Sequence, residues 1–384
     1  MIAVVERPTP WQRLRPILLG FDPTLMVAVL MLCGIGLTIM YSAGYDFGTR
    51  FTEHARNMGI AFLVLFIVAQ ISPQQLMRLA VPIYTIGVAL LIATAIFGIT
   101  KKGATRWLNV GVVIQPSEVM KLAMPLMLAW YFQKREGKLS TLDFGIAGIL
   151  LLVPVGLVVK QPDLGTAILI LSAGIYVIFF AGLSWKLIVP VVLLGAGAIA
   201  AIVLSEERIC QDDVVWPLLR EYQKHRVWTL LDPTTDPLGK GFHIIQGMIA
   251  IGSGGVTGKG FMSGTQTHLE FIPERTTDFI FAAFSEEFGL VGDCLLLAGF
   301  TLLILRGLAI ANDAPSVFTR LLAGSITLSF FTYAFVNMGM VSGILPVVGV
   351  PLPFISYGGT AMVTIGLELG LLTSIARYRR SIQT

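Results

Sequence analysis

Residues 271–292, FIPERTTDFIFAAFSEEFGLVG, place ionisable side chains at the entrance of an apolar segment. They are Glu274, Arg275, Asp278, Glu286 and Glu287. An aspartate before a helix is commonly an N-cap, and this is the simplest explanation of Asp278. Capping does not explain Glu286, which lies about 12 Å deeper at roughly 1.5 Å per residue. A carboxylate at this position could also act as a general base or as a ligand of a cation.

Glu118 and Lys121 form a second ionisable pair in the segment QPSEVMK, residues 115–121. Side chains three residues apart lie on one face of a helix, so we expect the two to meet. They form either an internal ion pair or one wall of a polar cavity. In the cavity, Lys121 would bind a phosphate, and Glu118 would orient the Lys121 side chain.

The glycine-rich segment GSGGVTGKGF, residues 252–261, is not a nucleotide-binding P-loop. Ser253 stands at the first glycine position of that motif, and Gly260 follows Lys259 where Ser or Thr is required. The segment is either a flexible turn or a loop whose N–H groups, with Lys259, contact a lipid phosphate.

The composition places these groups in a membrane protein. Of the 384 residues, 55% are hydrophobic and 13% are charged, whereas a soluble domain has about 25% charged residues. The net charge of +4 is spread over loop ends, so we expect no nucleic-acid partner. No histidines pair at metal-ligand spacing, and three cysteines without a CxxC motif argue against a disulfide framework.

The apolar runs predict a single all-α membrane domain over residues 1–384, because a transmembrane helix needs roughly 20 apolar residues. Ten spans are expected, near 22–44, 55–71, 76–98, 116–133, 142–160, 164–182, 185–204, 279–306, 316–341 and 355–377. We expect a large extracytoplasmic loop at about 205–278, with an interfacial helix over 216–231 and a re-entrant or interfacial segment over 241–255.

Lys and Arg predominate in the short loops on the side of both termini, which the positive-inside rule assigns to the cytoplasm. The polar side chains of the spans then gather near the opposite, outer face. They include Arg106, Glu118, Lys121, Asp163 and Asp278. This pattern suits chemistry on a lipid headgroup better than a pathway through the bilayer.

The sequence resembles the SEDS family (shape, elongation, division and sporulation), and its elongation branch more than its division branch. The motifs that carry the resemblance extend over nearly the whole chain. They are RWLNVGVVIQPSEVMKLAMP (106–125), KQPDLGTA (160–167), LLDPTTDPLGKGFHIIQGMIAIGSGGVTGKG (230–260), THLEFIPERTTDFIFAAFSEEFGLVG (267–292) and MVSGILPVVGVPLPFISYGG (340–359).

The resemblance implies ten helices and a peptidoglycan glycosyltransferase that polymerises lipid II outside the bacterial inner membrane. It also implies a class B penicillin-binding protein as partner, within the elongation machinery of the cell envelope. The family's essential aspartate corresponds to Asp278. Two positions depart from the family pattern. Thr276 stands where a histidine is usual, and Glu368 stands inside the last span where a small or apolar residue is expected.

The implied reaction is an inverting displacement, for which one general base is enough. We expect Asp278 to be that base or, alternatively, the ligand of a divalent cation such as Mg²⁺ or Mn²⁺. The diphosphate leaving group needs positive charge, which Arg106 and Lys121, with Lys259 or Arg275, would supply. Glu118 and Glu286 are expected to line the same substrate site.

Two other functions stay open on the sequence. A lipid II flippase would need polar groups at mid-depth, for which Glu368 and Glu286 are the best candidates. A non-catalytic scaffold for the penicillin-binding protein would tolerate neutral substitutions of Asp278, Glu118 and Lys121.

Overall fold

The computed structural model describes residues 20–101, 104–109, 111, 113–205, 228–232 and 239–383. Of the predicted interfacial helix over 216–231, only residues 228–231 belong to this part, and they are helical. The segment over 241–255 forms helix α11 (Lys240–Gly254). The short helix α12 (Thr265–His268) follows it.

Long helices make up most of the described chain and overlap the ten predicted spans. They are α2 (Pro23–Ala43), α3 (Arg50–Val68), α4 (Pro73–Phe97), α5 (Pro116–Lys134), α6 (Thr141–Lys160), α7 (Leu164–Phe180), α8 (Trp185–Leu204), α13 (Ile280–Asn312), α14 (Val317–Val341) and α15 (Gly359–Gln383). Seven helices of the described chain are long and apolar enough to cross a membrane. The chain is therefore an all-α polytopic membrane protein, and the crossing by all ten helices stays a prediction.

Local signals in the sequence fix where several helices begin. Asp22 caps α2 by accepting a hydrogen bond of 3.1 Å from the N–H of Leu25. Ser72 with Gln75 and Ser316 with Thr319 form reciprocal capping boxes at the starts of α4 and α14. Each cap satisfies N–H groups that have no partner inside the helix.

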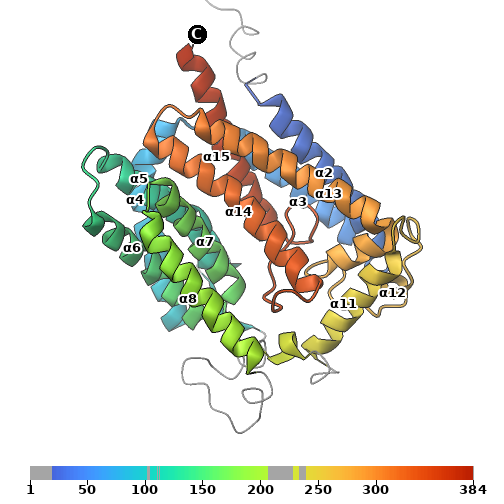
Figure 1. Cartoon of the computed structure of the whole chain (residues 1–384). Coiled ribbons are helices and arrows are strands. Elements are labelled where there is room, and N and C mark those ends of the chain that lie inside the picture. The colour runs from blue at the N-terminus through green and yellow to red at the C-terminus, as the bar shows by residue number, and fades with distance from the viewer. Residues whose placement is uncertain are drawn as a thin grey trace, which may run out of the picture.

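Helix α14 lies in the centre of the molecule, where it packs against α13 on one side and α5 and α7 on the other (Figure 1). In its most apolar window 78% of the residues are buried, compared with 28% for α3. Helix α15 packs along α3, and α13 packs along α2. Polar side chains on α14 therefore face other protein groups rather than lipid.

A small antiparallel sheet connects α4 to α5, which the apolar pattern did not predict. Its strands β1 (Ile99–Lys101), β2 (Ala104–Asn109) and β3 (Val113–Ile114) lie in the order β1-β2-β3. Thr100 pairs with Thr105, and Leu108 pairs with Ile114. The sheet carries Arg106 at the end of the helices where α5 and α7 begin.

Helix α13 is broken at Gly289, whose backbone has φ +59° and ψ −164°. The break frees N–H and C=O groups, and the loop that follows α11 replaces their helical partners. Leu290 and Val291 donate to the carbonyls of Gly255 and Val256 at 3.0 and 3.1 Å. In return, the N–H groups of Lys259 and Gly260 donate to the carbonyls of Glu286 and Glu287, both at 3.0 Å. The glycine-rich loop is thus docked on α13 by its backbone.

We predict that Gly289→Ala lowers the free energy of unfolding by about 3 kcal/mol, because this backbone conformation is essentially restricted to glycine. A side chain at Gly289 would also clash with the backbone of Gly258 and Val256. The unfolding temperature of the purified protein in detergent measures the effect. Gly252→Ala is the matched control, since Gly252 is helical and a Cβ there meets nothing within 4 Å. An equal loss in both variants would contradict the prediction.

Candidate active site

Asp278 does not cap α13. The N-cap of this helix is Phe279, and no side chain caps it. Asp278 lies in the turn before the helix and is half-buried. The capping explanation is therefore wrong, and the position of Asp278 has another cause.

Three consecutive carbonyls hold the segment that carries Asp278. The Tyr357 N–H donates to the carbonyl of Thr276 at 2.8 Å, and the Ser356 hydroxyl donates to that of Thr277 at 2.7 Å. The Asn337 amide donates to the carbonyl of Asp278 at 3.1 Å. We call Asn337, Ser356 and Tyr357 the carbonyl clamp. The clamp therefore fixes the backbone on both sides of Asp278, from which its carboxylate projects.

The clamp was not found from the sequence, although a signal existed. Asn337 is fully buried and is the only amide side chain of helix α14, whose other buried polar residues are hydroxyls of Ser, Thr and Tyr. Its amide also donates to the carbonyl of Val350 at 2.7 Å, and so joins α14 to the loop before α15. A lone amide in an apolar span is expensive unless it is bonded, which is the signal that marks Asn337.

Gly349 brings a bare backbone next to the carboxylate of Asp278. It has φ +74°, and a Cβ at this position would lie 3.3 Å from Oδ2 of Asp278. The start of α7 packs on the same loop, because a Cβ at Gly165 would lie 2.8 Å from the carbonyl oxygen of Val348. The loop between α14 and α15 therefore contacts both Asp278 and the start of α7.

Arg106, Gln115 and Asp163 form a polar cluster at the start of α7. Asp163 caps α7 and accepts a hydrogen bond of 3.1 Å from Gln115. The Arg106 guanidinium lies 3.7 Å from Asp163 and donates to the carbonyl of Pro162 at 2.9 Å. Its Nε is buried and has no hydrogen-bond partner among the described residues. An unused guanidinium donor suits an anionic ligand.

A cavity of about 650 Å³ opens between α3, α4, α5 and α15, and we call it the membrane groove. Most of its lining is apolar, including Ile83 and Leu122, but Gln115, Glu118 and Thr364 lie on its wall. Gln115 also belongs to the Arg106 cluster. The groove therefore connects an apolar channel along the helices to the polar region that adjoins the loop of Asp278.

Glu118 and Lys121 form the predicted ion pair, at 2.6 Å. Glu118 faces the membrane groove and accepts a hydrogen bond of 3.0 Å from Thr364 of α15. Lys121 is only 5% exposed and lies 5.5 Å from the ring centre of Tyr333 of α14. The pair thus joins three helices, with the carboxylate at the groove wall and the ammonium behind it.

Glu368 of α15 belongs to the same cluster. Its side chain is 2% exposed, and its Oε2 has no hydrogen-bond partner among the described residues. The charges of Lys121 and Glu118 act on it. The sequence offered no partner for this unusual glutamate, because residues on α5 and α15 meet only in the folded bundle.

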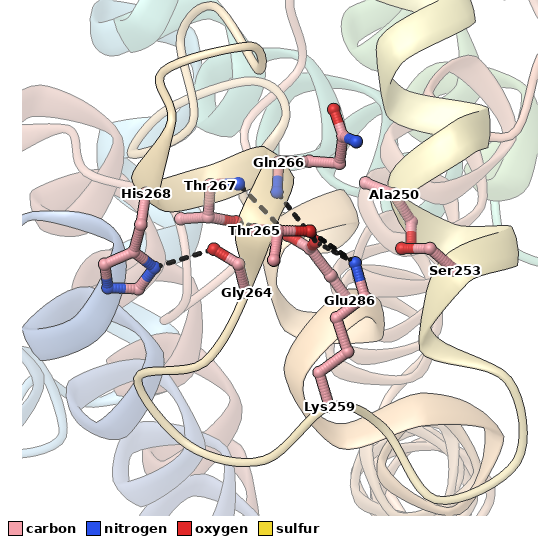
Figure 2. Close-up of polar contacts among 9 residues, drawn as sticks. All are labelled: Ala250, Ser253, Lys259, Gly264, Thr265, Gln266, Thr267, His268 and Glu286. Atoms are coloured by element: carbon pink, nitrogen blue, oxygen red, sulfur yellow. Dashed lines mark hydrogen bonds and ion pairs between the residues drawn. The ribbon is translucent and has the colours of Figure 1, made fainter.

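Lys259 and Glu286 form an ion pair with each other and do not face the proposed substrate site. Figure 2 shows the Lys259 ammonium and the groups of α12 converging on the Glu286 carboxylate. The Lys259 ammonium lies 2.7 Å from the Glu286 carboxylate. The backbone N–H groups of Gln266 and Thr267 donate to the same carboxylate at 2.8 and 3.1 Å. Glu286 is fully buried. These contacts give the pair a structural role, which is to hold the loop after α11 on α13.

Arg275 is also engaged with protein groups. Its side chain is buried, donates to the carbonyl of Ala43 at 3.1 Å and pairs with Asp46 in the loop between α2 and α3. Partial burial is the largest single effect and acts to raise the pKa of the Asp46 carboxyl, but the hydrogen bond and charge of Arg275, together with a backbone hydrogen bond, lower this pKa below its usual value. The pair therefore stabilises the fold above the ordinary pKa of an aspartate and is lost as the pH falls through the lowered one.

Of the seven predicted site residues, four lie at elements that contact one another, namely the α14–α15 loop, the start of α7 and the groove wall. Asp278 contacts the α14–α15 loop, Arg106 lies at the start of α7, and Glu118 and Lys121 lie at the groove wall. Lys259, Glu286 and Arg275 are held in ion pairs elsewhere. Among the described residues, no three His, Cys, Asp or Glu side chains come together as a metal centre.

Comparisons with known proteins identify the family. The family model of FtsW, RodA and SpoVE, described as cell cycle protein, matches residues 23–381. The chain is 45% identical to peptidoglycan glycosyltransferase MrdB of Escherichia coli K12, over 94% of this chain and 95% of that protein. It is 33% identical to stage V sporulation protein E of Bacillus subtilis, over 94% and 98% respectively.

Solved structures agree. A chain of a peptidoglycan synthase complex has a TM-score of 0.75 at 32% identity, over 94% of this chain and 98% of that one. The rod shape determining protein RodA of Thermus thermophilus has a TM-score of 0.68 at 27% identity, over 94% and 97%. The chain belongs to the FtsW/RodA/SpoVE family, which confirms the resemblance inferred from the motifs.

We predict that Asn337→Leu lowers the free energy of unfolding by about 2–4 kcal/mol, because two buried carbonyls lose their donor. Hydrogen exchange should rise in residues 271–279 and 345–357. Asn312→Leu, at the exposed end of α13, is the control and should change stability by less than about 0.5 kcal/mol. Unchanged exchange in the Asp278 segment would contradict the role of the clamp.

For the cluster of Glu118, Lys121 and Glu368 we predict that substitutions lower the free energy of unfolding by unequal amounts. Lys121→Met should cost about 3–5 kcal/mol, because it leaves the half-buried Glu118 carboxylate without its cation close to the buried Glu368. Glu368→Gln should cost far less, since Lys121 keeps Glu118. In the double variant, part of the loss should be recovered, with a coupling of roughly 0.5–3 kcal/mol measured by a double-mutant cycle. Additive losses would show that Glu368 does not interact with Lys121.

Proposed function

We propose that this chain is a peptidoglycan glycosyltransferase that polymerises lipid II during cell elongation and rod-shape maintenance, with release of undecaprenyl diphosphate. The observation that carries the proposal is the placement of Asp278, whose backbone is held by the carbonyl clamp and whose carboxylate lies beside Gly349. Relatives named peptidoglycan glycosyltransferase, aligned over almost the whole chain, support it.

In the proposed reaction, the 4-hydroxyl of one lipid-linked disaccharide attacks the anomeric carbon at the lipid-linked end of a second. Asp278 accepts the hydroxyl proton while the bond from carbon to the diphosphate oxygen breaks. An α-linked diphosphate becomes a β linkage in one displacement, so no nucleophilic carboxylate is needed. One ionised, rigidly held carboxylate is sufficient for this step.

The contacts favour Arg106 as the principal ligand of the diphosphate. Its guanidinium is only partly used by Asp163 and Pro162, and its buried Nε is unbonded among the described residues. Lys121 supplies a second positive charge from behind Glu118. Lys259 and Arg275 would first have to leave their carboxylate partners, so we assign them a supporting role.

A divalent cation is compatible with this site. Mg²⁺ is commonly held by one or two carboxylates together with phosphate oxygens and water, so a single Asp278 beside a diphosphate fits such an ion. When bound, the cation would neutralise charge on the leaving group. Polymerisation measured with and without a divalent cation distinguishes the two roles of Asp278, because a cation ligand predicts that activity requires the metal.

The membrane groove suits the isoprenoid chain of the substrate, because it is apolar along the helices and polar at Gln115 and Glu118. We propose that the chain lies in the bacterial inner membrane with both termini in the cytoplasm and Asp278 facing the periplasm. A class B penicillin-binding protein would crosslink the product. The likeness to a chain of a peptidoglycan synthase complex supports such a partnership.

We predict that Asp278→Asn lowers lipid II polymerisation by about 10²–10⁴-fold, since it removes the general base. The measurement is product formation by the purified protein with its penicillin-binding partner. Glu270→Gln, an exposed acid in the same loop, is the matched control and should keep full activity. Unfolding temperature and partner capture should be unchanged in both variants. A folded Asp278→Asn protein with normal polymerisation would refute the assignment and leave the scaffold function.

Glu368 is the one observation that favours a second candidate, a lipid II flippase. It lies buried in α15, about 14 Å along the helix from Gly359. A flippase would need this side chain to face a headgroup path, whereas in the structure it is buried within electrostatic range of Lys121, Glu118 and Tyr333. Headgroup translocation in liposomes that contain only this chain would reverse the order of the two candidates.

A further inference from the structure

A second cavity, of about 480 Å³, lies at the opposite ends of the helices from Asp278. Asp278 precedes α13, whereas Pro315, which lines the cavity, follows the other end of this 33-residue helix. Pro73 at the start of α4 also lines it, and α4 runs from there to the sheet that carries Arg106. The cavity is therefore separate from the proposed reaction site.

The cavity has polar and apolar parts. Lys134, Gln74 and Ser316 offer an ammonium, an amide and a hydroxyl, and Tyr378 contributes a phenol. Met77 and Ile375 supply apolar surface. A tyrosine beside basic and apolar side chains at the ends of transmembrane helices is typical of the level of lipid headgroups. Such a lining suits an amphipathic ligand better than a fully hydrated ion.

The charge around the cavity is positive. None of the described lining residues is acidic, and Lys134 is exposed. Two exposed acids lie nearby in sequence but do not line the cavity: Glu136 accepts a hydrogen bond of 2.6 Å from Gln133, and Asp313 ends α13 two residues before Pro315. The balance favours an anion.

We propose that this cavity binds an anionic phospholipid, with the headgroup phosphate at Lys134 and the acyl chains along the apolar faces of α4 and α15. Basic pockets between transmembrane helices are recognised sites for acidic lipid headgroups. A phospholipid here contacts α4, α5, α14 and α15 together. Three of these, α4, α5 and α15, also form the membrane groove, so the lipid stabilises the groove from the far end.

The test uses the purified full chain in uncharged detergent, with phosphatidylglycerol, phosphatidylcholine of the same acyl chains, or glycerol 3-phosphate added. Phosphatidylglycerol should raise the unfolding temperature by a saturable amount, because a ligand of the folded state stabilises it. Phosphatidylcholine and glycerol 3-phosphate should not. An equal shift with phosphatidylcholine, or with glycerol 3-phosphate alone, would overturn the lipid assignment.

Variants locate the binding. Lys134→Gln should weaken the apparent affinity for phosphatidylglycerol about fivefold, the equivalent of roughly 1 kcal/mol for one basic residue. Gln74→Trp keeps the charge but fills the cavity, and should weaken binding as well. Lys138→Gln is the control, since Lys138 is exposed in the loop after α5 and does not line the cavity.

If Lys134→Gln and Lys138→Gln weaken the apparent affinity for phosphatidylglycerol equally, binding depends only on general surface charge and the site is refuted. Full binding by Gln74→Trp would also refute the site. The readout is lipid-dependent stability, without any activity measurement. Its failure would therefore leave the proposed glycosyltransferase function untouched, and the reverse is also true.

Discussion

The carbonyl clamp is the interaction on which the rest of the proposed site depends. A carboxylate acts best as a base when its backbone is fixed, and the turn before α13 has only short-range backbone bonds of its own, from the N–H groups of Thr277 and Phe279 to the carbonyl of Glu274. Asn337, Ser356 and Tyr357 supply further bonds from α14 and the loop before α15. Because Asn337 is buried in the central helix, the position of Asp278 is tied to the packing of the whole bundle.

The other polar groups obey the constraint that buried charges in a bilayer must be neutralised. Most of the acids are assigned partners of their own: Glu286 has Lys259, Asp22 has Arg306, and Glu118 has Lys121. These pairs also join segments that are distant in the sequence. Glu286 holds the loop after α11, and Asp22 joins the start of α2 to α13. The charges that made residues 271–292 unusual therefore serve mainly to assemble the end of the bundle where α13 begins, and we assign chemistry to Asp278 alone.

Much of the fold could be predicted from the sequence, for simple physical reasons. Apolar runs of about 20 residues are satisfied in a bilayer only as helices, so the long helices were expected at nearly the right positions. The pairing of Glu118 with Lys121 followed from helical spacing. The small sheet of Arg106 was missed because its strands are short, and the break at Gly289 was missed because its compensating bonds come from a separate loop.

The sequence by itself determined the class of protein, the family and the candidate aspartate, because composition, hydrophobic length and motifs are local properties. Only the tertiary structure decided which charged side chains pair with each other. It paired Lys259 with Glu286 and Arg275 with Asp46, and it brought Glu368 to Lys121. It also placed Gly349 and Asn337 around Asp278. These contacts join residues that are far apart along the chain, and their geometry is set by helix packing, which no local pattern encodes.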